Sequence, residues 1–274
     1  VNDNRSCKSA TINSFIEQTT AEVLIATDAN ILFKETTIEE LVRPIALQKA
    51  TAVAGTLAYE AGGVINSTAT NEKVYLSLEN AIRRAESRKH GICFGMEGGL
   101  YSMRKSFWKP IPPNTFMEDF FQTVQLIASD QKVLFNEAAI GLEDVSTSLR
   151  EEYKRKIRIS IGNWQNLIRF YPLLFKHPYP FGILFLMHKV LRWLTPHLYL
   201  IALIAGLFTS QWMIISIVLI GLPVSQFILM SFGLATPLAY FYVMNTALFV
   251  GFLRYLKGVK SSVWQPTKRN QHES

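Results

Sequence analysis

The feature that most constrains this chain is a long stretch without charge in its C-terminal part. Between Arg192 and Arg254 the sequence contains no Asp, Glu, Lys or Arg. A helix that crosses a lipid bilayer needs roughly 20 mostly apolar residues, so this stretch has room for two such helices, or for three if tight turns join them. The sequence therefore predicts an integral membrane protein.

Three apolar segments divide the uncharged stretch, at residues 194–209, 212–230 and 235–253. The first is the shortest and has Pro196 and His197 near its start, so we expect it to be tilted, re-entrant or interfacial. A short helix that extends backwards can still span, which leaves three crossings as the alternative. We expect the other two segments to be the firm spans of a transmembrane region at 194–256.

Residues 177–193 join this region to the rest of the chain. The segment is apolar and aromatic but carries His188, Lys189 and Arg192. This composition is typical of an amphipathic helix that lies in the bilayer interface.

The net positive charge of the chain gathers around the apolar region. Residues 1–176 hold 21 Lys and Arg against 20 Asp and Glu, whereas residues 177–274 hold 7 against 1. The basic residues that flank the uncharged stretch are Lys189 and Arg192 before it and Arg254, Lys257, Lys260, Lys268 and Arg269 after it. The positive-inside rule places such residues on the cytoplasmic side. We therefore expect a basic cytoplasmic tail at 257–274 and no nucleic acid partner.

The first part of the chain alternates strand-like and helix-like segments. The strand-like segments are residues 23–26, 51–59 and 132–135, and the helix-like ones are residues 37–45, 71–89, 118–126 and 148–170. This alternation predicts a sheet covered by helices, an α/β fold. Residues 91–101 are rich in glycine, so we expect a sharp turn or a close approach to another group there. Cys7 and Cys93 are too few for a disulfide framework, which agrees with a reducing compartment.

Asp28 and Asn30 follow directly on the apolar run at residues 23–26. The carboxyl end of a buried strand is where open α/β sheets bind ligands, and carboxylate and amide oxygens suit a divalent cation. The alternative is an ordinary turn, because Asp and Asn are common turn residues.

Two further groups of residues carry chemistry on predicted helices. Glu118 and Asp119 open a helix, where they either complement the helix dipole or supply a general base. Arg155 and Arg158 share one helix face, which is either solvated or binds a diphosphate. Trp164, farther along the same helix, is interpreted as a packing residue or as a platform for a sugar.

Taken in order, these pieces resemble the processive, polysaccharide-type members of glycosyltransferase family 2, which include cellulose, hyaluronan and poly-N-acetylglucosamine synthases. Residues 5–13 are similar to the Arg-x-Gly-Lys-x-x-Ala-Leu-Asn segment of that family, and residues 27–30 are similar to its Asp-x-Asp motif. Residues 98–104 resemble its small-residue loop near the acceptor. Residues 118–119 resemble its acid pair, and residues 155–159 resemble its Gln/Arg-x-x-Arg-Trp motif. Three positions depart from the pattern: Cys7 stands where glycine is usual, Asn30 replaces the second acid, and Ile159 stands where the best-known synthases have tryptophan.

The resemblance implies a GT-A type, nucleotide-diphospho-sugar transferase domain at residues 1–176 and a role for each matching residue. Asp119, with Glu118, would be catalytic. The donor diphosphate would be bound by Lys8, Asp28, Arg155 and Arg158. A divalent cation (Mg²⁺ or Mn²⁺) would be bound by Asp28 and Asn30. The acceptor would be bound by Gly98, Gly99 and Trp164.

The function expected from this resemblance is inverting transfer of a sugar from a UDP-sugar to a hydroxyl of a growing glycan, with the catalytic domain on the cytoplasmic face of the membrane. Ile159 leaves room for a polyprenyl phosphate or another lipid acceptor as an alternative. Asn30 leaves room for a non-catalytic membrane partner that retains the fold. Because the chain starts at Val1 without an initiator Met or a signal segment, we expect its GT-A domain to be incomplete at the N-terminus and this chain alone to be inactive.

Overall fold

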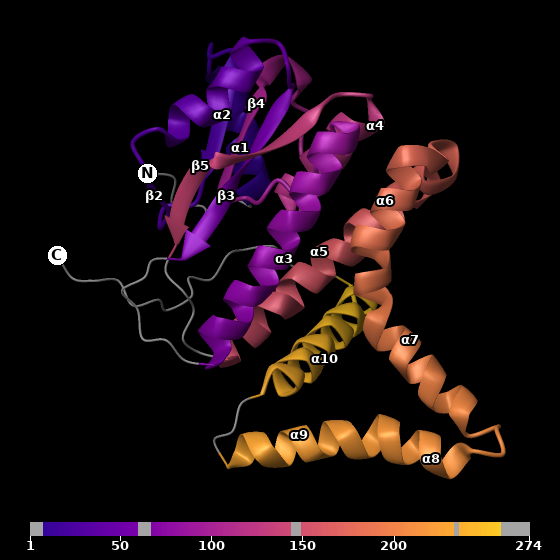
Figure 1. Ribbon diagram of the computed structural model, residues 1–274. Helices are drawn as coiled ribbons and strands as arrows, with labels where there is room; N and C mark the ends of the chain where they lie inside the picture. The colour runs from indigo at the N-terminus through magenta and orange to yellow at the C-terminus, as the bar shows by residue number, and fades with distance from the viewer. Residues whose placement is uncertain (1–7, 60–66, 144–148, 233–235, 259–274) are drawn as a thin grey trace.

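A computed structural model describes residues 8–59, 67–143, 149–232 and 236–258. A five-stranded mixed sheet with helices on both faces forms one end of the molecule, and apolar helices form the other (Figure 1). The strands are β1 (Val23–Thr27), β2 (Leu32–Phe33), β3 (Ala52–Tyr59), β4 (Leu100–Arg104) and β5 (Val133–Glu143). Their order in the sheet is β1-β4-β3-β5-β2, in which β3 and β5 are parallel and the other neighbouring pairs are antiparallel.

Helices alternate with these strands along the chain, which confirms the α/β prediction. They are α1 (Lys8–Gln18), α2 (Thr37–Ala46), α3 (Ser67–His90), the short 3-10 helix η1 (Lys105–Phe107), α4 (Glu118–Ala128) and α5 (Leu149–Lys176). One predicted strand was too short, and another strand was not predicted. The strand expected at 132–135 continues to Glu143, because its later part pairs with both β3 and β2. The glycine-rich segment at 91–101 ends in β4, which was not predicted.

The sheet has a hydrophobic core on each face. On one face α2 packs Leu41 and Ile45 against Val53 of β3. On the other face Ala52 and Ala54 of the same strand belong to a larger cluster that includes the aromatic side chains of α4. This division follows from the period of two along a strand, which sends successive side chains to opposite faces.

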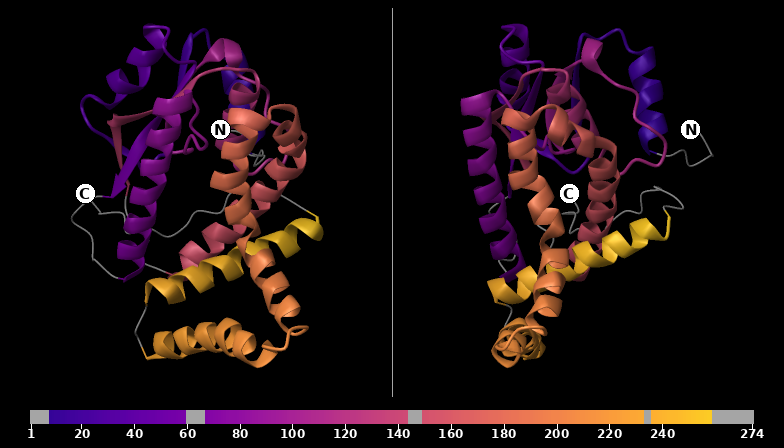
Figure 2. Two further views of the ribbon diagram at one scale, coloured as in Figure 1. Left: turned by 45° about the vertical axis from the view of Figure 1, so that its right-hand side comes forward. Right: turned by 90° about the vertical axis from the view of Figure 1, so that its right-hand side faces the viewer.

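The apolar helices at the other end of the molecule begin directly after α5. They are the π-helical turn η2 (Pro178–Gly182), α6 (Ile183–Phe185), the π-helical turn η3 (Leu186–Val190), α7 (Leu191–Gly206), α8 (Trp212–Ser216), the π-helical turn η4 (Ile217–Gly221), α9 (Leu222–Ser231) and α10 (Pro237–Leu256). Both views of Figure 2 place α8 and α9 at the end of the molecule farthest from the sheet. Together they form one continuous helix from Trp212 to Ser231, with a mean hydropathy of 2.3. Within the described ranges it is the one helix that is both long and apolar enough to cross a membrane.

Helix α10 packs along α5 of the first part. A Cβ atom at Gly251 would lie 2.4 Å from Cβ of Ser160. The Ser160 hydroxyl donates a hydrogen bond of 2.6 Å to the carbonyl of Leu248. The number of membrane crossings stays a prediction, since the structure contains no bilayer.

The segment at 177–193 differs from the expected arrangement of charge. His188 and Lys189 are buried, at 8% and 5% exposure, against α3. Ile183, Met187 and Leu191 recur every fourth residue and are 52%, 63% and 37% exposed, so they form one outward helix face. The segment is amphipathic, but its polar side faces α3 and its apolar side faces outwards. The physical reason is that two buried glutamates of α3 pair with these basic groups.

Candidate functional site

The end of β1 and the start of β4 bring the predicted metal loop beside the glycine loop. Thr27 pairs with Leu100 in an antiparallel register, so Asp28 lies next to Gly99. A Cβ atom at Gly99 would lie 3.0 Å from Cδ1 of Ile31, which is closer than a real Cβ usually approaches. Glycine at this position therefore lets the two loops pack together.

Asp119 lies in the first turn of α4 and faces the same glycine loop. Its Oδ1 accepts a hydrogen bond of 2.8 Å from the backbone N–H of Phe120. Gly98 donates a second backbone N–H to the carboxylate, and a Cβ atom at Gly98 would lie 3.4 Å from Oδ2. Asp28, the glycine pair and Asp119 thus occupy one corner of the molecule.

The environment of Asp119 favours its neutral form. Burial and the neighbouring charge of Glu118 raise the pKa of Asp119 to about 7, against the lowering effects of the hydrogen bonds from Phe120 and Gly98 and of the Lys8 charge. The partly buried carboxylate is therefore balanced between its two protonation states near neutral pH. A general base works best when its pKa lies near the operating pH.

Lys8 forms an ion pair with Glu118 at the same corner. Burial opposes the ammonium charge, but Glu118, with smaller contributions from Asp28 and Asp119, outweighs it and raises the pKa of Lys8. Three carboxylates therefore surround one lysine. Their excess of negative charge is the kind that a bound cation offsets.

The residues present fit a cation held mainly by a single carboxylate. Asp28 is exposed, whereas the side-chain nitrogen of Asn30 donates to Oε1 of Glu143 at 3.4 Å. Ions such as Mg²⁺ are often bound through one or two carboxylates together with substrate phosphates and water. Within the described ranges no group of three or more His, Cys, Asp and Glu residues that could hold a metal ion occurs.

Helix α5 carries Arg155 and Arg158 on the face that contacts the loop before Asp119. A Cβ atom at Gly162 would lie 2.5 Å from Cγ of Met117, and residues 155, 158 and 162 share this face by helical spacing. Arg158 is exposed, and Nε of Arg155 lies 3.4 Å from Oε2 of Glu152. The diphosphate role of the two arginines stays a prediction.

Trp164 of α5 packs against the apolar helices. Its ring centroid is 5.2 Å from that of His197 on α7 and 4.5 Å from that of Phe252 on α10. These contacts are those of a packing residue, and its acceptor role stays a prediction.

The sequence did not reveal Tyr101, Glu97 or Arg83 as neighbours of the site. Tyr101 is buried, and its burial, with the nearby carboxylates, raises the pKa of its phenol. Glu97 precedes the glycine pair and binds the buried Arg83 of α3. The available signal was the four-residue spacing of Glu79 and Arg83 on one predicted helix, which is also ordinary for a surface ion pair.

Comparison with solved structures relates this fold to a known enzyme. The chain matches the mannosyltransferase PcManGT from Pyrobaculum calidifontis, solved in complex with GDP-Man and Mn²⁺, with a TM-score of 0.58 and 18% sequence identity. The match covers 91% of this chain and 66% of that chain, so this chain spans just under two thirds of the mannosyltransferase. No protein-family model and no curated protein sequence matches. The chain therefore shares the fold of a nucleotide-sugar glycosyltransferase at low sequence identity.

Proposed function

We propose that this chain is the catalytic and membrane-associated part of a glycosyltransferase that moves a sugar from a nucleoside-diphosphate donor to a hydroxyl acceptor. The observation that carries the proposal is the corner where Asp119 faces the Gly98 loop beside Asp28. A partly buried carboxylate with a pKa of about 7 and an adjacent exposed aspartate combine the two groups that such a transfer needs: a base for the acceptor and an anchor for the donor.

In the proposed reaction Asp119 accepts the proton of the acceptor hydroxyl as that oxygen attacks the anomeric carbon of the donor. The new glycosidic bond forms on the face opposite the breaking bond to the diphosphate, so the configuration inverts. Lys8, Arg155 and Arg158 interact with the leaving diphosphate. Asp28, with Asn30 beside it, would hold Mg²⁺ or Mn²⁺, whose chemistry there is to offset phosphate charge.

The pairing of Glu118 with Lys8 supports Asp119, rather than Glu118, as the base. Glu118 already forms an ion pair with the ammonium group of Lys8, so its carboxylate is already engaged by a cation. Asp119 has no such direct partner among the described contacts and has the raised pKa.

A membrane setting is part of the proposal. Large apolar side chains are exposed from α7 to α9, among them Ile204 of α7, Phe208 of the following turn, Ile214 of α8, Ile217 of η4 and Ile228 of α9. Contiguous exposed apolar surface of this kind marks contact with a membrane or another protein. We propose a lipid bilayer, because the continuous helix from Trp212 to Ser231 has the length and hydropathy of a span.

The donor and acceptor are proposed more narrowly from the sequence motifs. We propose a UDP-sugar donor and a glycan acceptor, with GDP-mannose, the ligand of the structural neighbour, as the competing donor. A polyprenyl phosphate or another lipid is the second acceptor class, supported by the apolar helices that lie beside the site-bearing part of the chain.

The test is transfer of radiolabel by the protein as its own cells make it, in native membranes, rather than by this chain alone. UDP- and GDP-sugars are supplied in parallel with Mn²⁺, and the product is sorted into polymer, lipid-linked sugar or none, with Asp119→Asn membranes as the control. We expect label from a UDP-sugar in polymer, absent from the control. Label in lipid selects the second acceptor class, and no label from any donor contradicts the proposed enzyme and favours a non-catalytic partner.

A further inference from the structure

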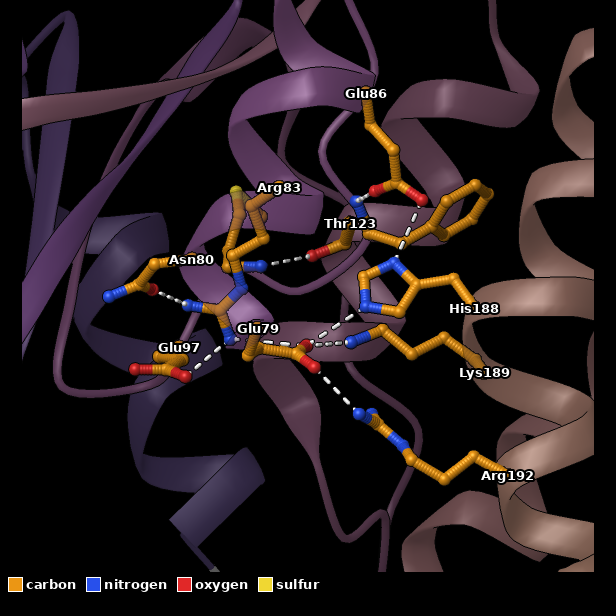
Figure 3. A network of polar contacts seen from close by, with 11 residues as sticks. Glu79, Asn80, Arg83, Glu86, Glu97, Thr123, His188, Lys189 and Arg192 are labelled. Carbon is orange, nitrogen blue, oxygen red and sulfur yellow. Dashed lines mark hydrogen bonds and ion pairs between the residues drawn. The ribbon is translucent and has the colours of Figure 1, made fainter. Parts of the chain in front are cut away.

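A network of buried charges lies behind the glycine loop (Figure 3). Helix α3 contributes Glu79, Arg83 and Glu86, the segment that leads into the apolar helices contributes His188, Lys189 and Arg192, and the loop before β4 contributes Glu97. Three carboxylates and three basic groups, Arg83, Lys189 and Arg192, pair with one another, and His188 lies between Glu79 and Glu86.

Glu79 is the centre of the network. It is 3% exposed, and its Oε1 accepts hydrogen bonds from Nζ of Lys189 at 2.5 Å and lies 3.1 Å from Nε2 of His188. Its Oε2 accepts a hydrogen bond of 2.6 Å from Arg192. Burial alone would raise the pKa of Glu79, but these partners hold it well below its usual range. The carboxylate therefore stays charged and fixes the helix that carries the three basic residues.

Arg83 connects Glu79 to the glycine loop, because it contacts both Glu79 and Glu97. The guanidinium is buried, with Nη2 3.6 Å from Oε1 of Glu79 and hydrogen-bonded to Oε1 of Glu97. Nη1 donates to Asn80 at 3.3 Å. Glu97 directly precedes Gly98, the residue whose N–H meets the Asp119 carboxylate.

Residues 94–99 are held between this network and α4. Gly95 has a φ of +119°, and a Cβ atom there would lie 3.2 Å from Nζ of Lys189. The N–H of Phe94 donates to Glu86 at 3.4 Å. On the other side the N–H of Met96 donates to the Thr123 hydroxyl, which itself donates to the carbonyl of Asp119. The loop therefore contacts the basic helix segment on one side and the helix of Asp119 on the other.

Buried charges of this kind are a weak source of stability, because their desolvation offsets their attraction. A hydrogen-bonded network is better suited to fixing one geometry, and in the described part of the chain Nε of Arg83 is the one buried polar atom of this network without a hydrogen-bond partner. We propose that Arg83 and Lys189 are positioning residues: acting through Glu79 and Glu97, they hold the loop at 94–99 so that Gly98 meets Asp119. This inference rests on the proposed function for its catalytic consequence. It makes the segment at 186–192, which leads into the apolar helices, a structural part of the catalytic corner.

The kinetic test compares neutral and conservative variants of both residues. Arg83→Gln and Lys189→Met should each lower kcat on the order of 10- to 100-fold, the size expected from a small misplacement of a reacting group, with the donor KM changed about 2-fold or less. Arg83→Lys and Lys189→Arg should recover part of the loss. Glu97→Gln, at the more exposed edge of the network, is the milder variant if the buried substitutions do not fold.

Arg84→Gln is the matched control, because Arg84 neighbours Arg83 on α3 but forms an exposed ion pair with Glu137. It should leave kcat and KM unchanged. Unchanged kcat in folded Arg83→Gln and Lys189→Met protein, or a loss in Arg84→Gln as large as in Arg83→Gln, overturns the inference.

A readout independent of activity uses Cys93, which is fully buried beside Phe94. In a Cys7→Ser background we expect a thiol reagent to label Cys93 at least 10-fold faster in Glu97→Gln and Lys189→Met than in the parent or in Arg84→Gln, because loosening the loop opens the site more often. If the parent transfers no sugar but the labelling rates differ as expected, the proposed function fails and the positioning of the loop stands. Equal labelling rates in all variants overturn the inference that this network positions the loop.

Discussion

Asp119 combines two properties that oppose each other. Two backbone N–H groups hydrogen-bond its carboxylate, which favours the charged form. Burial and the charge of Glu118 favour the neutral form more strongly and raise its pKa to about 7. The carboxylate is thus fixed in position by hydrogen bonds while it keeps enough basicity to take a proton.

Replacing Asp119 tests this role directly. Asp119→Asn should lower turnover on the order of 100-fold or more, while donor binding persists because the diphosphate groups remain. Glu118→Gln should cost less, since Glu118 is paired with Lys8. In the parent, kcat/KM should rise with pH and level off above a pKa of about 7, measured by initial rates of label transfer. Near-normal turnover of Asp119→Asn would remove Asp119 from the mechanism.

The same substitution should affect stability in the opposite direction. The folded-state pKa of Asp119 lies above its ordinary value of 3.8, so between about pH 4 and pH 7 the native state keeps a proton that the unfolded chain has lost. Stability therefore falls as pH rises through this window. Asp119→Asn removes the ionisation, and its Tm should exceed that of the parent at pH 8, with the difference vanishing near pH 4. An equal Tm difference at both pH values contradicts the assignment of the raised pKa.

Asn30 gives a third prediction at this scale. Its amide nitrogen donates to Glu143, which is 9% exposed. In Asn30→Asp this hydrogen bond is lost and a second carboxylate faces Glu143, so the apo protein should lose stability, by about 0.5–1.5 kcal/mol for the lost hydrogen bond. Mn²⁺ should restore it, because the second carboxylate strengthens the cation site. Thermal unfolding of the parent and of Asn30→Asp with Mn²⁺ and with EDTA measures the effect. If the Tm of neither protein changes with Mn²⁺, no cation binds at this loop.

At this scale the sequence named Asp28, Gly98 and Asp119 as candidates because each belongs to a motif of the family that it resembles, and their roles stay predictions. The pairing of Arg83 with Glu97 carries no local signal, because 14 residues and a change of direction separate them. Such contacts depend on how α3 and the following loop pack, which spacing alone does not determine.

Among the elements, helix α10 has the closest packing against the catalytic part of the chain. Small residues allow it: Cβ at Gly251 would lie 2.4 Å from Cβ of Ser160 and 2.7 Å from the carbonyl oxygen of Ile157. The sequence described 235–253 as a membrane span from its hydropathy, and hydropathy does not distinguish a lipid-facing helix from one whose small residues pack on a neighbour. In the segment at 177–193, which side faces inwards depends on Glu86 and Glu79, which lie 102 and 109 residues from His188, and an interfacial position of the segment stays a prediction.

Two glycines of the apolar helices give a matched pair for this packing. Gly251→Ala should destabilise the protein by about 1–3 kcal/mol, the usual cost of overpacking, because backbone atoms of α5 block the new methyl group. Gly221→Ala should be neutral or slightly stabilising, since its nearest neighbour, Cγ2 of Ile217, would be 3.9 Å away. Thermal unfolding in detergent compares the two. A Tm for Gly251→Ala equal to that of Gly221→Ala would show that α10 does not dock on α5 in solution.

For the molecule as a whole, the docking of α10 bears on membrane topology. The helix runs beside α5, with Phe252 against Trp164 near its end, so its C-terminal end lies on the side of the catalytic part. In Figure 1 the chain leaves this part through α7, runs along α8 and α9, and returns through α10. A chain that leaves and returns to one side crosses the bilayer an even number of times. The same result follows from the basic residues after Arg254, which favour the cytoplasmic side.

We therefore expect a thiol introduced after α10 to be protected from the outside of intact cells. The measurement places Cys at Ser261 or Ser262, with Cys7 and Cys93 replaced, and applies a membrane-impermeant thiol reagent before and after permeabilisation. Labelling should occur only after permeabilisation, because the tail shares the compartment of the nucleotide-sugar donor. A second cysteine at Ser210, in the turn between α7 and α8, identifies which two segments cross. If Ser210→Cys is labelled from outside, α7 and the helix formed by α8 and α9 cross the membrane. If it is protected, the segments at 212–230 and 235–253 cross. Labelling of the tail in intact cells would instead mean an odd number of crossings, and α10 could not then pack on α5 as it does here.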